Sequence, residues 1–106
     1  MESDWKTFRK RVPEWRERYL MEKNREIIAI LADESKTPTE RFWDAEKKMK
    51  EEGRILVECL DGHSRSKMEW YLLLMHRRGL IRDDDLKEFS EDLRNHLSAA
   101  SRNLGR

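Results

Sequence analysis

Eight consecutive residues, from Met68 to Met75, read Met-Glu-Trp-Tyr-Leu-Leu-Leu-Met, and this apolar run is the feature that most restricts the fold. It lies in a chain in which 42% of the residues are charged and 37% are hydrophobic. A surface helix of a small domain carries apolar side chains on one stripe only. Apolar side chains on every side therefore predict a helix that is buried all round, either at the centre of the fold or between subunits.

The composition predicts an all-α protein. Four Gly and two Pro are few for a chain of many short strands and turns. A length of 106 residues suits one domain with a single core. We therefore expect residues 1–106 to form one compact antiparallel bundle of about five helices, and we expect that bundle to self-associate.

Local signals divide the chain into helices over residues 3–11, 13–32, 38–60, 65–78 and 84–100, with a frayed tail at 101–106. Pro13 is expected to end the first helix and to start the second, since proline suits the first turn of a helix and not its interior. Ile28 widens the apolar face of the second helix, which predicts deeper packing in that half. Thr37-Pro38-Thr39-Glu40 has the pattern of a capping box with proline at the first helical position.

Gly53 could end the third helix, but the apolar pattern continues through it. The inner face expected for this helix consists of Phe42, Ala45, Met49, Leu56 and Cys59. An alternative makes residues 55–57 a buried strand, although the chain offers no second strand to pair with it. Asp61-Gly62 and Gly79 suit helix ends, and the three aspartates at 83–85 suit a helix start.

The charge balance disfavours several partners. Lys plus Arg number 23 and Asp plus Glu number 22, so net charge gives no reason to expect nucleic-acid binding.

The longest apolar run is too short to span a bilayer, and the first residues do not resemble a signal peptide. Cys59 is the only cysteine, so no intrachain disulfide can form. We expect a cytoplasmic protein that does not bind membranes.

The loop at residues 61–67 is a candidate ligand site. His63, Ser64, Arg65 and Lys67 gather polar and basic groups at a helix start, where free amides can hold a phosphate or carboxylate. Turn chemistry alone also explains the Asp, Gly and Ser of this loop. Ser64 and Lys67 have the spacing of a serine nucleophile and its lysine, but the other motifs of such enzymes are absent.

No cofactor and no metal are assigned. Cys59 and His63 are four residues apart, which on an unbroken helix would place two metal ligands together. Gly62 is expected to break that register, and with one cysteine and three histidines a structural zinc site would need carboxylates or a second subunit to complete it. Cys59 is expected to be a small core residue.

Four tryptophans are many for so short a chain. Aromatic side chains are enriched at protein interfaces, and we take Trp43, Trp70, Leu73 and Leu74 as candidate interface residues. The alternative is that all four tryptophans belong to one core.

Three functional hypotheses follow. The first is a non-enzymatic interaction or regulatory protein that acts as a homo-oligomer or with a protein partner. The second is a small binding module for an anionic ligand or nucleic acid, centred on the 61–67 loop. The third is an enzyme that uses His63 with a carboxylate such as Asp61.

Overall fold

The computed structural model describes residues 2–104, with side chains up to residue 101, and it is all-α. The described residues form four α-helices and two short 3-10 helices: α1 (Glu2–Leu31), α2 (Pro38–Leu60), η1 (Arg65–Lys67), α3 (Met68–Arg78), η2 (Asp83–Glu88) and α4 (Glu91–Leu104). No strand occurs in this part of the chain, so the alternative of a strand at residues 55–57 is wrong. None of the described helices is long and apolar enough to cross a membrane.

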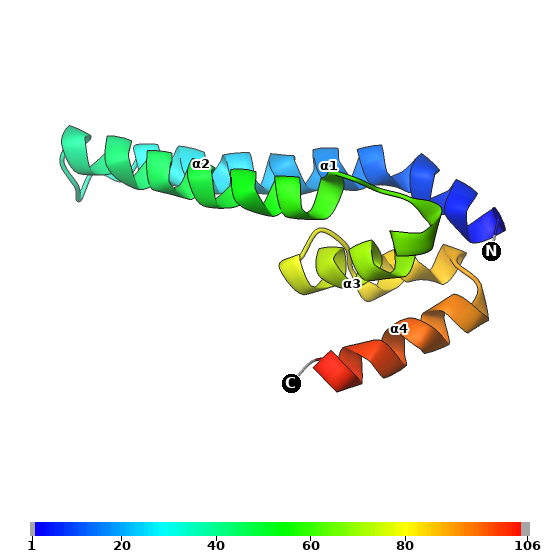
Figure 1. Cartoon of the computed structure of the whole chain (residues 1–106). Helices are drawn as coiled ribbons and strands as arrows, with labels where there is room; N and C mark the ends of the chain where they lie inside the picture. The colour runs from blue at the N-terminus through cyan, green and yellow to red at the C-terminus, as the bar shows by residue number, and fades with distance from the viewer. Residues whose placement is uncertain (1, 105–106) are drawn as a thin grey trace.

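The molecule has a compact end and a projecting arm (Figure 1). α1 and α2 form a long antiparallel hairpin, and α3 and α4 pack beneath only the half that contains the N-terminus. The radius of gyration is 16.5 Å and the longest dimension is 52 Å. A compact domain of this length has a radius of gyration of about 13 Å. The half of the hairpin next to the 32–37 turn therefore projects from the rest of the protein.

α2 follows the sequence prediction closely. Thr37 Oγ1 accepts a hydrogen bond from the Glu40 amide, and the Glu40 carboxylate accepts one from the Thr37 amide, which completes the capping box. The helix continues through Gly53 to Leu60, as predicted. Gly62 and Gly79 both have positive φ angles, and Gly79 ends α3 in the left-handed conformation.

The predicted break at Pro13 is wrong, because α1 is one helix of 30 residues with Pro13 inside it. Proline fits the φ angle of a helix and costs one backbone hydrogen bond. Phe8, Trp15 and Tyr19 lie on both sides of Pro13 and enter the same core, at 1%, 3% and 4% exposure. Their shared burial keeps the residues before and after Pro13 in one continuous helix despite that cost.

The last helix begins later than expected. Residues 83–88 form the 3-10 helix η2, and α4 starts at Glu91 rather than at residue 84. Phe89 is extended and buried, with its ring 6.3 Å from that of Trp15. Ser90 then caps α4, since its hydroxyl accepts from the Leu93 amide. α4 continues to Leu104, so the tail expected to fray from residue 101 is helical up to there, and residues 105–106 lie outside the described residues.

The apolar run is not buried all round. Met68, Leu72 and Met75 are buried in the core, Leu73 and Leu74 are half-buried, and Trp70 is 52% exposed. The 3-10 turn η1 occupies the first residues of the helix predicted at 65–78. α3 is short and packs against α2 on one side and α4 on the other, which leaves its outer side in contact with solvent.

A buried carboxylate joins the two ends of the fold. Asp4 is 3% exposed and accepts hydrogen bonds from the amide of Ser90 at 2.8 Å and from its hydroxyl at 2.7 Å. Because Ser90 is also the cap of α4, Asp4 fixes the point where the last helix turns back onto α1.

We predict that Asp4→Ala destabilises the protein by about 1–3 kcal/mol, because it leaves the partly buried Ser90 amide and hydroxyl without their acceptor. Urea unfolding followed by circular dichroism measures this loss. The neighbouring exposed change Ser3→Ala should shift stability by less than about 0.5 kcal/mol. Equal midpoints for Asp4→Ala and the unaltered protein would contradict the structural role of this contact.

Candidate functional site

The 61–67 loop, which is predicted to bind a ligand, is hydrogen bonded to α3. Tyr71 Oη donates a hydrogen bond to the Asp61 carbonyl oxygen at 2.6 Å. The same hydroxyl lies 3.1 Å from the position that a Cβ atom on Gly62 would occupy, and Gly62 has a φ angle of +78°. The loop is therefore a tight connection whose backbone is held against a core helix.

His63 points into the protein. Its ring packs edge-on between Phe8 and Tyr71, with centroid distances of 4.9 and 4.6 Å. Nε2 lies 2.7 Å from the Cys59 carbonyl oxygen, which can only accept, so this nitrogen carries the proton. Among the described residues no carboxylate is hydrogen bonded to this ring, so the pairing with Asp61 that the enzyme hypothesis requires is not formed.

The other three loop residues do not share a common partner. Arg65 forms an ion pair with Glu2 at 2.8 Å, and the hydroxyl of Ser64 lies 3.4 Å from that of Ser66. Lys67 is exposed. The four residues share a short segment but do not converge on one point, and an anionic ligand at this loop stays a prediction.

Cys59 is a core residue, as expected. Its side chain is fully buried, and burial raises the pKa of the thiol to about 11. His63 meets the Cys59 carbonyl rather than its sulfur, so the two do not form a ligand pair. No group of three His, Cys, Asp or Glu side chains that could hold a metal ion occurs in the described part of the chain.

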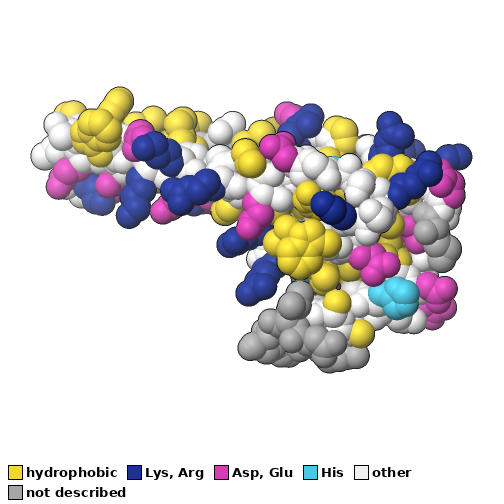
Figure 2. All heavy atoms as spheres, viewed as in Figure 1, with side chains coloured by type: hydrophobic (Ala, Val, Ile, Leu, Met, Phe, Trp, Pro, Cys, Tyr) yellow, Lys and Arg dark blue, Asp and Glu magenta, His cyan; other side chains and the backbone are white. Residues whose placement is uncertain are grey.

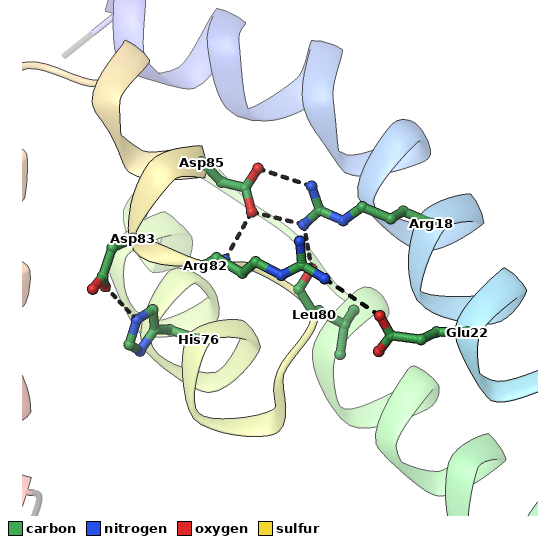
Figure 3. Close-up of polar contacts among 7 residues, drawn as sticks. All are labelled: Arg18, Glu22, His76, Leu80, Arg82, Asp83 and Asp85. Atoms are coloured by element: carbon green, nitrogen blue, oxygen red, sulfur yellow. Dashed lines mark hydrogen bonds and ion pairs between the residues drawn. The ribbon is translucent and has the colours of Figure 1, made fainter. Parts of the chain in front are cut away.

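A charged cluster joins α1 to the segment after α3 (Figure 3). Arg18 donates to both carboxylate oxygens of Asp85, at 3.0 and 2.7 Å, and to the Leu80 carbonyl oxygen at 3.0 Å. The Arg82 amide also donates to Asp85, at 2.7 Å. Burial alone would raise the pKa of Asp85, but the hydrogen bonds from Arg18 and Arg82 hold it below its ordinary value. Because every member has a partner within the protein, this cluster is a structural clamp.

A pocket of about 400 Å³ lies between α3, η2 and α4. The side chains of Leu72 and Leu97 are buried there, and His76, Asp83 and Arg94 bring polar groups to its lining. His76 Nε2 lies 2.8 Å from Asp83, whose side chain is 93% exposed (Figure 3). Because Asp83 is almost fully exposed, this contact is not enclosed by the pocket, and the described residues show no catalytic arrangement there.

The arm has almost no apolar core of its own. The buried apolar side chains between the two helices of the arm are Ile27 and Ala45, at 7% and 5% exposure. Nearer the compact end the interhelical space is polar. Glu52 accepts a hydrogen bond from the Tyr19 hydroxyl, and Lys48 Nζ bridges Glu52 and Glu26 at 3.0 and 2.8 Å.

Large apolar side chains along the outer side of the hairpin are exposed instead, most of them on the arm and Val57 nearer the compact end. We call the following residues the arm face: Met21, Ile28 and Leu31 on α1, and Phe42, Met49 and Val57 on α2. Each is between 47% and 63% exposed. Phe42 and Met49 were expected on the inner face of α2, and Ile28 was expected to pack deeply, so these predictions are wrong. α1 packs more deeply in its first half, where α3 and α4 cover it.

Helix geometry places the arm face on one side of the hairpin. Successive residues of a helix are rotated by about 100°. On α1, Met21 and Ile28 lie about 100–120° around the helix axis from buried Ile27. On α2, Phe42 and Met49 lie about 40–60° from buried Ala45, with the rotation in the same sense. Because the two helices run antiparallel, both sets point to the same side. Trp15 and Tyr19 lie on the opposite side of α1, against the rest of the core. Hydrophobic side chains follow the upper edge of the arm in Figure 2, away from α3 and α4.

The predicted interface residues fall in two separate places. Trp43 is 59% exposed on the projecting half of α2, edge-on to Phe42 at 5.0 Å. Trp70, Leu73 and Leu74 belong to α3 at the compact end. Trp15 is a core residue, so the tryptophans do not all belong to one class. The seven-residue spacing of Met21 with Ile28, and of Phe42 with Met49, was the signal for the arm face that sequence analysis missed.

Comparison with known proteins identifies no relative: no protein-family model, no curated protein and no solved structure matches this chain.

We predict that the Cys59 thiol does not react with a thiol reagent at pH 8 in the folded protein and reacts once urea unfolds the chain. The pKa of about 11 lies above the ordinary 9.0, so the folded state favours the neutral thiol. The contribution of this group to stability is therefore complete below pH 9 and is lost as the pH rises towards 11, by an amount on the order of 2 kcal/mol.

Urea unfolding at a series of alkaline pH values measures this loss, and Cys59→Ala is the control because it removes the titrating group. The stability difference between the two proteins should shrink from pH 9 upwards. A constant difference between pH 8 and pH 11, or rapid labelling of the folded protein, would contradict the prediction.

Proposed function

We propose that this protein is a non-enzymatic interaction module and that it binds another protein chain, its own copy or a partner, through the arm face. The observation that carries the proposal is the exposure of six large apolar side chains on one side of a hairpin with little core of its own. Scattered apolar residues are common on protein surfaces, whereas a contiguous apolar patch of this kind typically marks an interaction site.

The energetics of a two-helix arm support the same conclusion. Isolated helices of this length are marginally stable in water, and in proteins they depend on packing of an apolar face. Ile27 and Ala45 alone supply little such packing. A bound chain would cover the arm face and would stabilise the arm.

The mixed charges around the arm favour a protein as the partner. Glu46 and Lys50 form an ion pair at 3.1 Å beside the arm face, and Lys23, Glu26 and Lys48 are paired within the hairpin. Nucleic acids and anionic membranes attract surfaces of one sign, which this arm lacks.

An extract of the source cells tests the proposal, with the tagged protein as bait and mass spectrometry as readout. Ile28→Lys places a charge in the arm face and should abolish capture of the chains that the unaltered protein retains. Ala29→Lys is the matched control, since it adds the same side chain at an exposed position about 100° around the helix, and it should leave capture unchanged.

Circular dichroism must show equal helix content in both variants, so that lost capture reports binding rather than unfolding. Retention of the same chains by Ile28→Lys would overturn the proposal. So would a protein that captures nothing and also stays monomeric at high concentration.

A further inference from the structure

We infer that the occupant of the arm face is a second copy of this chain, and that two arms pack face to face, pointing in opposite directions, as an antiparallel four-helix bundle. This inference rests on the proposed function, because it names the partner that the arm face binds. Three features of the arm carry it: the register of its two helices, the placement of one glycine, and the charges beside the face.

The register of the hairpin is fixed by three contacts between its helices. Arg41 Nη1 donates to the Leu31 carbonyl oxygen at 3.2 Å near the turn, and Lys48 pairs with Glu26 at 2.8 Å midway along the arm. The Tyr19 hydroxyl donates to Glu52 nearer the compact end. The middle of the arm face therefore lies near Asn24 on α1 and near Lys48 on α2.

A two-fold axis through this midpoint, perpendicular to the arm, brings like helices together in antiparallel pairs. On α1, Met21 of one copy then lies opposite Ile28 of the other, and the reverse contact forms by symmetry. Asn24 lies at the centre, next to its own counterpart. A polar residue at one core position of a helical bundle typically fixes the register and the number of chains, which suits the exposed position of Asn24 within the arm face.

The same axis places Phe42 of one copy over Gly53 of the other. Phe42 is 59% exposed, and a Cβ atom added to Gly53 would meet nothing within 4 Å. Within one chain, a glycine in the middle of a helix only lowers helix stability. Between two copies, it provides the space that a large ring needs, as interdigitation of large and small side chains requires.

The charged residues beside the arm face on α2 are complementary to the same residues of a second copy. Glu46 and Lys50 pair along α2 at 3.1 Å, and Lys50 Nζ remains well exposed. In the antiparallel arrangement Lys50 of one copy lies within a helical turn of Glu46 of the other. On α2, the two ion pairs then combine into a group in which each Lys50 lies beside the Glu46 of the other copy.

The size of the arm face suits such an interface. At roughly half to two-thirds exposure, six large apolar side chains offer on the order of 600 Å² of apolar surface. Each partner in a standard protein interface contributes about 800 Å² in total. The flanking side chains of Asn24, Glu46 and Lys50 supply the polar remainder.

Solution mass tests the inference on the full chain. Light scattering coupled to gel filtration, from micromolar to millimolar protein, should give twice the mass of one chain. Gly53→Gln should raise the dissociation constant of the dimer at least about tenfold, because it fills the space that Phe42 of the second copy needs. Glutamine favours helix more than glycine does, so the single chain should not unfold.

Arg54→Gln is the matched control, because it introduces the same side chain at the neighbouring exposed position, about 100° around the helix from Gly53. It should leave the dimer unchanged. A monomer at every concentration would overturn the inference, and so would a dimer that Gly53→Gln does not weaken. A monomer whose capture of a different protein is still abolished by Ile28→Lys would leave the proposed function standing and remove only the second copy.

Discussion

The difference in length between the long helix α1 and the short helix α3 determines the shape of this protein. α1 has 30 residues and α3 has 11, which correspond to about 45 Å and about 16 Å of helix. A short helix cannot cover a long one, so α3 and α4 bury only the half of the α1–α2 hairpin around Phe8 and Trp15. The projecting arm follows from this mismatch, whereas the arm face is exposed because it lies on the side of the hairpin away from α3 and α4.

Specific polar contacts then define where each element lies on that hairpin. Asp4 holds Ser90 at the start of α4, and Arg18 holds Asp85 and the Leu80 carbonyl oxygen at the turn after α3. Both contacts join residues far apart in sequence, and both satisfy groups that burial would otherwise leave unpaired. They direct α3, η2 and α4 to the compact end. The residues beyond Ile27 on α1 receive no such contact from the described residues of the second half of the chain.

Local sequence signals predicted local structure well. The capping box at Thr37, the continuous helix through Gly53, the helix end at Gly79 and the burial of Cys59 were all predicted, because neighbouring residues decide them. The errors concern positions where distant residues decide. Pro13 stays within a helix because Phe8 and Trp15 share one core, and α4 begins only at Glu91 because Phe89 packs against Trp15. The ring of His63 lies between Phe8 and Tyr71, a position that its sequence neighbours do not indicate.

The sequence by itself determined the all-α class, the extent of α2 and the apolar character of each helix, since period, caps and propensity act over a few residues. It could not say which apolar faces are covered. Phe42 and Ala45 belong to the same stripe of α2, yet Ala45 is buried and Phe42 is 59% exposed. Only the tertiary structure decided this, because Ala45 packs against α1 while Phe42 points to the side of the hairpin that no other described helix covers. The arm face is exposed because α3 and α4 pack on the opposite side of the hairpin.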